Sequence, residues 1–175
     1  LPDHHPFKRL RVQPEVETAP EVWLLGSSDY SGALAAQLGL PYSFAHFINP
    51  DGGDVVMKNY LESFKAGREK TPRTMVCTFL ICAESDTEAE RLAAPIDLRR
   101  LHMALNVDSA VPTQEEAERH AYSEEERRYV MGQRARAIIG GPQTCRAALE
   151  EMAARYGADE VMLLTITGDY QSRMR

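Results

Sequence analysis

The hydrophobic pattern of the chain alternates between short apolar runs and longer stretches of helical periodicity. Apolar runs without polar alternation indicate strands buried on both faces, and apolar stripes at a spacing of three or four residues indicate amphipathic helices. We predict four strands, over 21–26, 42–48, 73–83 and 160–167. Helices are expected to begin near residues 30, 54, 85, 123 and 142 and to end near 38, 66, 106, 139 and 156.

Capping patterns support two of these helix starts. Ser85 and Glu88, and likewise Ser123 and Glu126, have the spacing of a capping box. Pro95 lies inside the third helix and is expected to kink or divide it, because proline removes a backbone donor.

This order of elements predicts one α/β domain. Strands that alternate with helices favour a parallel sheet covered by helices, with right-handed crossovers. We predict a single domain over 1–175, with an extended arm over 1–20, an inserted connection over 107–122 and a tail over 168–175.

Composition and length narrow the picture further. The chain has 175 residues, of which 43% are hydrophobic, and this composition is typical of a soluble globular domain with its own core. A complete (β/α)₈ barrel usually needs about 250 residues, so the length alone does not suggest one. Because the sequence begins without Met, we expect a processed, truncated or partial polypeptide.

The charge balance excludes two classes of partner. The chain has 20 Lys and Arg against 26 Asp and Glu, a formal charge of −6, which disfavours nucleic acids and anionic membrane surfaces. No apolar run approaches the ~20 residues of a membrane helix, and no signal peptide is visible. We therefore expect a cytoplasmic protein.

The cysteines and the histidine pair give no sign of a metal centre. Cys77, Cys82 and Cys145 lack CxxC spacing, and buried thiols in a reducing compartment explain them better than a disulfide or a zinc site. His4 and His5 lack further ligands at suitable spacing, so we predict no metal site.

The most informative local feature is the loop after the first predicted strand, with Gly26, Ser27, Ser28 and Asp29 followed by Tyr30 and Ser31. In parallel α/β folds such loops lie on the ligand side, and hydroxyls with helix N-terminal amides suit a phosphate monoester. The alternative is that Ser28 or Asp29 only caps its own helix.

Two weaker candidates accompany this loop. The segment 140–144 is a second possible anion site, and its alternative is a plain turn before a proline-initiated helix. His46 ends the second predicted strand, where with Tyr42 and Phe44 on the same face it could contact a flat heterocycle, although a packed strand residue is the simpler interpretation. GxSxG, Walker A, GxGxxG and paired-carboxylate motifs are absent, so a self-sufficient hydrolase or nucleotide kinase is not supported.

Three blocks of the sequence resemble the bacterial luciferase-like, FMN-dependent monooxygenases, which are (β/α)₈ barrels. They are Pro20–Pro50, with its Gly-Ser-Ser loop and Phe-Ala-His strand, Ala83–Ala94, and Gly140–Leu164. The resemblance implies that the four predicted strands are the fifth to eighth of a barrel, so that the chain is the C-terminal half of such a fold.

The resemblance also implies a cofactor and a set of contacts. Ser28 and Ser31 would donate hydroxyls and Tyr30 a backbone amide to the FMN phosphate, while Gly26 and Ser27 would shape the loop. His46 is added to these cofactor-binding candidates because of its place at the end of the second predicted strand. Family members oxidise a small organic substrate with oxygen and reduced flavin, supplied by a reductase or by NAD(P)H, through a flavin peroxy adduct.

The match departs from the family in two respects. The family's first half, with its flavin-side histidine, has no counterpart, and 140–144 reads Gly-Gly-Pro-Gln-Thr where a hydroxyl residue before the proline and an acid after it are expected. The catalytic residues therefore stay unassigned.

Two functions of different class follow. The first is half of an FMN-dependent monooxygenase, which should form a homo-oligomer or pair with a missing N-terminal half because a half-barrel leaves sheet edges uncovered. The alternative is a non-catalytic flavin- or phosphate-binding module with the same half-barrel fold.

Overall fold

The computed structural model describes residues 2–11, 13–14, 17–18, 20–67 and 69–174. The expected arm over 1–20 and tail over 168–175 are described only in part. Residues 1, 12, 15, 16 and 19 of the arm and residue 175 of the tail lie outside the described residues.

The strands of the described chain form one parallel sheet. They are β1 (Leu24–Gly26), β2 (Tyr42–Ala45), β3 (Thr74–Cys82), β4 (Ala137–Gly140) and β5 (Glu160–Leu164). β2 pairs with β1 and β3, and β3 also pairs with β4 and β5, each time in parallel. The predicted α/β fold with a parallel sheet is therefore confirmed.

The strand β4 corrects the expected count of four. We predicted that the helix opening at Ser123 continues to about residue 139, whereas α5 (Glu124–Gln133) ends earlier and a short 3₁₀ turn, Arg134–Arg136, leads into β4. Phe79 is paired with both Ala137 and Leu164, so β4 and β5 lie on opposite edges of β3. Four strands, β1, β2, β3 and β5, thus lie side by side, and β4 extends the edge of β3 beyond β2.

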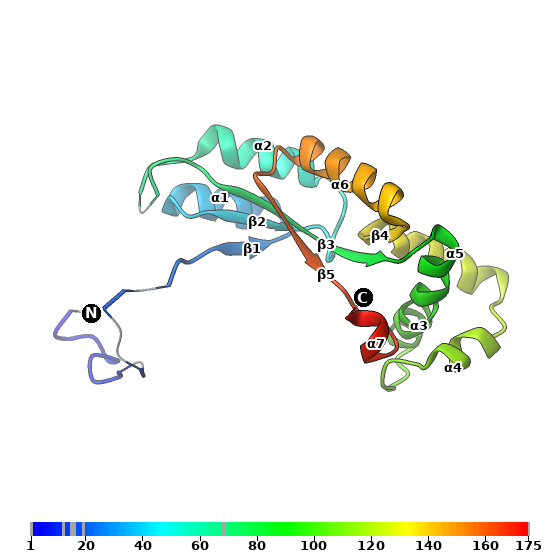
Figure 1. The fold of residues 1–175 in the computed structure, drawn as a ribbon. Helices are drawn as coiled ribbons and strands as arrows, with labels where there is room; N and C mark the ends of the chain where they lie inside the picture. The colour runs from blue at the N-terminus through cyan, green and yellow to red at the C-terminus, as the bar shows by residue number, and fades with distance from the viewer. Residues whose placement is uncertain (1, 12, 15–16, 19, 68, 175) are drawn as a thin grey trace.

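Three helices cover one face of this sheet (Figure 1). They are α1 (Asp29–Leu38), α2 (Gly53–Ser63) and α6 (Pro142–Tyr156). Tyr42, Phe44 and Val76 point to this face and form a core with Met57 and Tyr60 of α2, all of them fully buried. Burial of these large side chains is the main force that holds the helices to the sheet.

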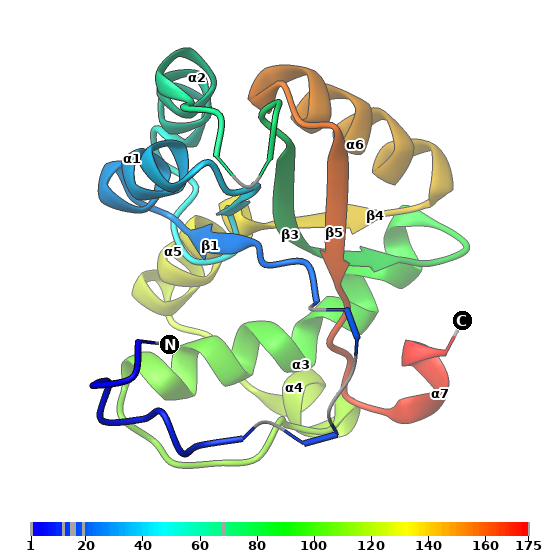
Figure 2. The same ribbon diagram turned by 90° about the vertical axis from the view of Figure 1, so that its left-hand side faces the viewer.

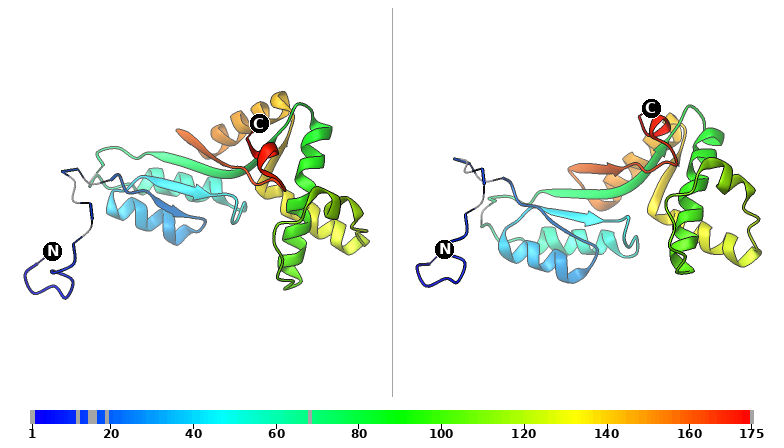
Figure 3. Two further views of the ribbon diagram at one scale, coloured as in Figure 1. Left: turned by 60° about the horizontal axis from the view of Figure 1, so that its bottom comes forward. Right: turned by 90° about the horizontal axis from the view of Figure 1, so that it is seen from below.

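Among the described helices, only α3 packs on the other face of the sheet, near the carboxyl end of β3 (Figures 1 and 3). There α3 (Asp86–Ala104) packs Ala89 and Leu92 against Ile81. Side chains alternate between the faces of a strand, so Leu25 and Met162 point to the uncovered part. They are 53% and 47% exposed, and β5 is thus not the buried strand that its apolar sequence predicted.

Helix α3 continues through Pro95, so of the two predicted outcomes, a kink or a division, the division is not observed. A proline in a helix leaves the carbonyl four residues earlier without its usual donor. Here the Arg91 carbonyl accepts a hydrogen bond from Gln114 Nε2 at 2.8 Å. A side chain from the next helix thus replaces the lost backbone bond and keeps α3 in one piece.

Two short helices lie in segments that we expected to be irregular. The helix α4 (Gln114–Arg119) interrupts the connection over 107–122, and α7 (Tyr170–Arg173) occupies part of the tail. Thr113 and Glu116 form a capping box at α4, so the Thr-x-x-Glu spacing carried a signal for this helix. Figure 1 shows α3, α4 and α5 together at the end of the molecule toward which β3 runs, and Figure 2 shows α3 and α4 lying below the sheet.

Candidate functional site

The loop after β1 closes tightly onto the first turn of α1. Ser28 is the N-cap of this helix, and its hydroxyl oxygen accepts from the Ser31 amide at 3.4 Å. The Ser31 hydroxyl donates to the Ser28 carbonyl at 2.7 Å and accepts from the Ser28 amide at 3.3 Å. The cap that we gave as the alternative to a ligand site is therefore present.

The two serines differ in how their hydroxyls are held. Ser31 Oγ also lies 2.9 Å from the Tyr42 hydroxyl, which donates to the Gly26 carbonyl. A side chain at Gly26 would collide with Ser31, so glycine is required at this position. Ser31 thus ties the loop to β2, whereas Ser28 is exposed at the surface.

A depression of about 420 Å³ opens beside this loop. It lies between the loops that follow β1 and β2, and Ser27, Ser28, Asn49 and Gly52 contribute to its wall. Gly52 is the N-cap of α2 and provides no side-chain cap. The N-termini of α1 and α2 therefore both face the depression, where their dipoles favour a negative charge.

The depression offers backbone donors to an anion but is also lined by two carboxylates. Among the hydrogen bonds of the described residues, none has the Asp29 or Tyr30 amide as its donor. Asp29 and Asp51 also line the depression, and their carboxylates oppose an anion. The site can offer backbone amides and hydroxyls to a phosphate, but it includes no lysine or arginine among its lining residues.

The second candidate anion site, over 140–144, is filled by the protein itself. The Asp86 carboxylate accepts a hydrogen bond from the Gly141 amide at 2.6 Å, at the N-terminus of α6. This bond, together with one from the Thr144 side chain, lowers the pKa of Asp86 below its ordinary value. Asp86 follows the end of β3 and Gly141 follows the end of β4, so the two residues meet because these strands are neighbours. The sequence analysis did not predict this contact because it did not predict β4.

The structure places His46 in the core, away from the Ser28 loop. Its Nδ1 lies 2.7 Å from the Tyr156 hydroxyl and its Nε2 lies 2.9 Å from the Ala135 carbonyl, and the side chain is only 5% exposed. Burial lowers the pKa of His46, which favours the neutral ring. Both ring nitrogens are thus occupied within the chain.

The aromatic surface that we expected beside His46 is not available to a ligand. Tyr42 and Phe44 are fully buried between the sheet and its helices. The reason is strand alternation, because these residues share the helix-covered face with Val76. The notion of a flat heterocycle stacked on them is therefore corrected.

The described part of the chain has neither a metal-ligand cluster nor a membrane-spanning helix. It contains no group of three or more His, Cys, Asp and Glu side chains placed to hold a metal ion. None of its helices combines the length and the apolar character needed to span a bilayer. The three cysteines are free thiols; Cys77 and Cys145 are buried, whereas Cys82 is exposed, contrary to our expectation of three buried thiols.

The chain is similar in sequence to a known family of proteins. The sequence model of a family described as luciferase-like monooxygenase matches residues 2–160. The uncharacterized protein YceB of Bacillus subtilis (strain 168) is 36% identical over 174 residues, which are 99% of this chain and 53% of YceB.

Solved structures share the fold. The crystal structure of apo-MsnO8 superposes with a TM-score of 0.83 at 30% identity, over 95% of this chain and 51% of that protein. The oxygenating constituent of 3,6-diketocamphane monooxygenase from Pseudomonas putida, solved in complex with FMN, has a TM-score of 0.51 at 18% identity, over 83% and 42% of the two chains. The chain thus spans about half the length of the relatives that it matches.

Proposed function

The chain belongs to the luciferase-like monooxygenase family, and from this premise we propose that it is the C-terminal half of an FMN-dependent monooxygenase and contributes the loop that holds the FMN phosphate. The observation that carries the proposal is the depression between the N-termini of α1 and α2, beside the Gly26–Ser31 loop. Ligands of parallel α/β folds bind at this end of the strands.

The residues present fit the phosphate end of FMN. The Asp29 and Tyr30 amides stand in the first turn of α1 and are available as donors. The Ser28 oxygen accepts its capping bond through a lone pair and lies 3.3 Å from the Ser31 hydroxyl, and rotation of the exposed Ser28 hydroxyl would direct its proton to a phosphate oxygen instead. Gly26 and Ser27 give the loop its shape, and Ser31 positions Ser28.

The role of the protein in the reaction is mainly positioning. Bound reduced FMN supplies the electrons for oxygen activation, taken from a reductase or from NAD(P)H. The loop fixes the phosphate and so orients the rest of the cofactor along the carboxyl ends of the strands. His46, held by Tyr156 and Ala135, fixes the start of the loop after β2, and we propose that it supports the wall of the depression from the core rather than by contact with the cofactor.

Titration of FMN with the 175-residue chain tests the proposal by quenching of flavin fluorescence. Ser28→Ala removes one hydrogen bond to a charged group, so we expect roughly tenfold weaker binding. Ser31→Ala should also weaken binding, because it releases the loop from Tyr42.

Ser123→Ala is the matched control, because Ser123 caps α5 in the same kind of capping box. It should cost similar stability, about 1 kcal/mol, with no loss of FMN affinity. Asp29→Asn removes a like charge from the depression and should strengthen binding. Equal affinity of the Ser28→Ala and Ser123→Ala variants would contradict the proposed phosphate site.

A non-catalytic flavin- or phosphate-binding module is the second candidate. It is favoured by one observation, that the depression is lined by no histidine, cysteine, tyrosine or lysine that could transfer a proton at neutral pH. Oxygen consumption driven by reduced FMN or NAD(P)H distinguishes the two. Turnover with a small organic substrate supports the enzyme, and binding without turnover supports the module.

A further inference from the structure

A second hollow lies where α3 and α5 meet the carboxyl ends of β3 and β5. Its volume is about 380 Å³, within the usual range of small-ligand pockets, roughly 300 to 1,000 Å³. Most of its wall is apolar and includes Phe47 and Phe79, whose rings are 5.6 Å apart. Arg99, Arg100 and Arg136 also line it, and no Asp or Glu does. Such a concentration of positive charge is unexpected in a chain with a net charge of −6.

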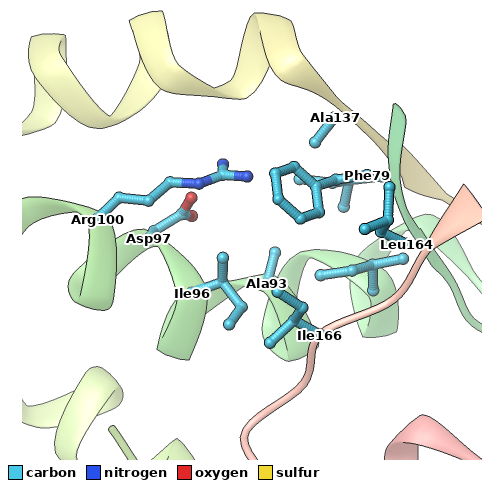
Figure 4. Close-up of a pocket in the computed structure, with 10 residues that line it drawn as sticks. Phe79, Ala93, Ile96, Asp97, Arg100, Ala137, Leu164 and Ile166 are labelled. Carbon is cyan, nitrogen blue, oxygen red and sulfur yellow. The ribbon is translucent and has the colours of Figure 1, made fainter. Parts of the chain in front are cut away.

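Arg100 is the residue at the centre of this arrangement. Its guanidinium carbon lies 5.1 Å from the centre of the Phe79 ring. Figure 4 shows Arg100 extending from α3 toward Phe79, with the Asp97 carboxylate beside it in the adjoining cavity. Among the hydrogen bonds and ion pairs of the described residues, none involves the Arg100 guanidinium.

The nearby Asp97 carboxylate forms no hydrogen bond or ion pair with Arg100, because it is bound by Arg134. Asp97 is 4% exposed, and its Oδ2 accepts from Arg134 at 2.6 and 3.0 Å. Arg134 also pairs with Glu90. The other carboxylate oxygen of Asp97, Oδ1, has no partner. Asp97 is thus engaged by Arg134, and its charge acts on Arg100 only at longer range.

The Arg100 guanidinium lies on a largely apolar wall, where it has lost part of its hydration and has no directly bonded anion. Burial lowers the pKa of Arg100 from its ordinary value, yet arginine stays protonated in proteins. Such a group forms strong paired hydrogen bonds with a carboxylate, and its flat face stacks on an aromatic ring. The pocket therefore combines one end that suits a negative charge with walls that suit an apolar body.

We propose that this pocket binds a small organic carboxylate with an aromatic or alkyl body, with Arg100 holding the carboxylate and Phe47 and Phe79 packing against the body. Phe79 lies at the carboxyl end of β3, on the face of the sheet opposite α1 and α2. This inference deepens the proposed function by naming a substrate class. That the bound carboxylate is a substrate rests on the proposed function. The binding itself requires no flavin.

Isothermal titration calorimetry of the 175-residue chain without FMN tests the pocket. The probes are 3-phenylpropionate and its uncharged amide, 3-phenylpropionamide. We expect the acid to bind at least roughly tenfold more tightly, because only the acid forms charged hydrogen bonds with the guanidinium. Equal binding of the two probes to the unaltered chain, or no binding of the acid, would overturn the proposal without any variant.

Three variants assign the preference to Arg100. Arg100→Gln should abolish the difference between acid and amide, and Arg100→Lys should retain part of it. Arg146→Gln is the control, because Arg146 pairs with Glu150 on the exposed surface of α6, and it should leave the preference unchanged. A folded Arg100→Gln variant that keeps the full preference would contradict the assignment.

The two proposals fail separately. Ser28→Ala should weaken FMN binding and leave 3-phenylpropionate binding unchanged. If the acid binds with the expected preference and FMN does not bind, the carboxylate pocket stands and the proposed function fails. If FMN binds and the acid shows no preference, the proposed function stands and the carboxylate pocket is wrong.

Discussion

At the scale of single residues, Asp86 decides which helix N-terminus is open to a ligand. Its carboxylate occupies the amide end of α6, 2.6 Å from the Gly141 nitrogen, so this site is satisfied within the chain. The N-terminus of α1 has only a serine cap and retains free amides. The same local chemistry therefore yields a structural contact in one place and a candidate phosphate site in the other.

The Asp86 contact predicts a dependence of stability on pH. Its pKa is lowered in the folded state from the ordinary 3.8, so the unfolded chain binds protons more readily. The contribution is complete above the unfolded pKa and is lost as the pH falls through the lower folded pKa. The stability advantage of the natural chain over Asp86→Asn should therefore shrink on acidification from roughly pH 6 to 2.

Urea unfolding of both proteins at each pH measures this difference. Asp108→Asn, at an exposed position of the connection between α3 and α4, is the control and should show no such trend. A constant difference between the natural chain and Asp86→Asn across the acid range would contradict the role of the ionised carboxylate.

Some residue roles could be predicted from the sequence and others could not. The Gly-Ser-Ser loop was identifiable because its chemistry is local, and its capping geometry involves residues only three apart. The partners of His46 are 110 and 89 residues away, and no periodicity indicates such contacts. The same holds for Arg100 and Phe79, because α3 reaches β3 only through the tertiary fold.

At the scale of elements, the ends of α1 and α6 use the same device with different surroundings. Gly39 and Gly157 both adopt left-handed conformations, with φ of 61° and 56°. A side chain at Gly39 would lie 2.6 Å from the Gly67 nitrogen, whereas one at Gly157 would meet only Leu61 at 3.8 Å. Gly39 is therefore needed for both its conformation and the close approach of the chain after α2.

Alanine at these positions separates the two effects. Gly157→Ala should destabilise the protein by about 1 kcal/mol, the cost of a left-handed alanine. Gly39→Ala adds steric overlap and should cost about 2 to 3 kcal/mol in total. Chemical denaturation measures both values, and equal losses would show that the contact with Gly67 is readily relieved.

The elements that the sequence predicted well are those with strong patterns of their own. The strand β3 and the capped starts of α3 and α5 lie within a residue or two of their expected positions. The strand β4 was missed because Ile138 and Ile139 fit the end of a helical stripe as well as a four-residue strand. Only pairing with β3 distinguishes the two, and pairing is not a local property.

At the scale of the whole molecule, the sheet formed by the described residues has uncovered apolar surface and strands with an unpaired edge. Within the described chain β1, β4 and β5 each pair with a single strand, and Leu25 and Met162 are about half exposed on the uncovered face. Natural proteins rarely leave such edges without protection. We therefore expect the chain to associate with a second copy or with the complementary half of a barrel.

Lysine on the uncovered face tests this association. The variant with both Leu25→Lys and Met162→Lys should shift the 175-residue chain from oligomer toward monomer in sedimentation velocity, because burying the new charges is unfavourable. Met131→Lys is the control, since Met131 is 63% exposed on α5 and should leave the oligomer intact. A natural chain that sediments as a monomer at all concentrations would contradict the expectation.

The central position of β3 has a consequence for how the chain folds. Its contacts span increasing distances in sequence, 34 residues from Cys77 to Ser43, 58 from Thr78 to Arg136 and 85 from Thr74 to Asp159. Loop closure becomes costlier with length, and folds dominated by distant contacts form slowly. During synthesis β1, β2 and β3 can assemble early, whereas one edge of β3 stays unpaired until β5 has been made. Nascent chains stalled before residue 160 should therefore expose this edge of β3 to chaperones.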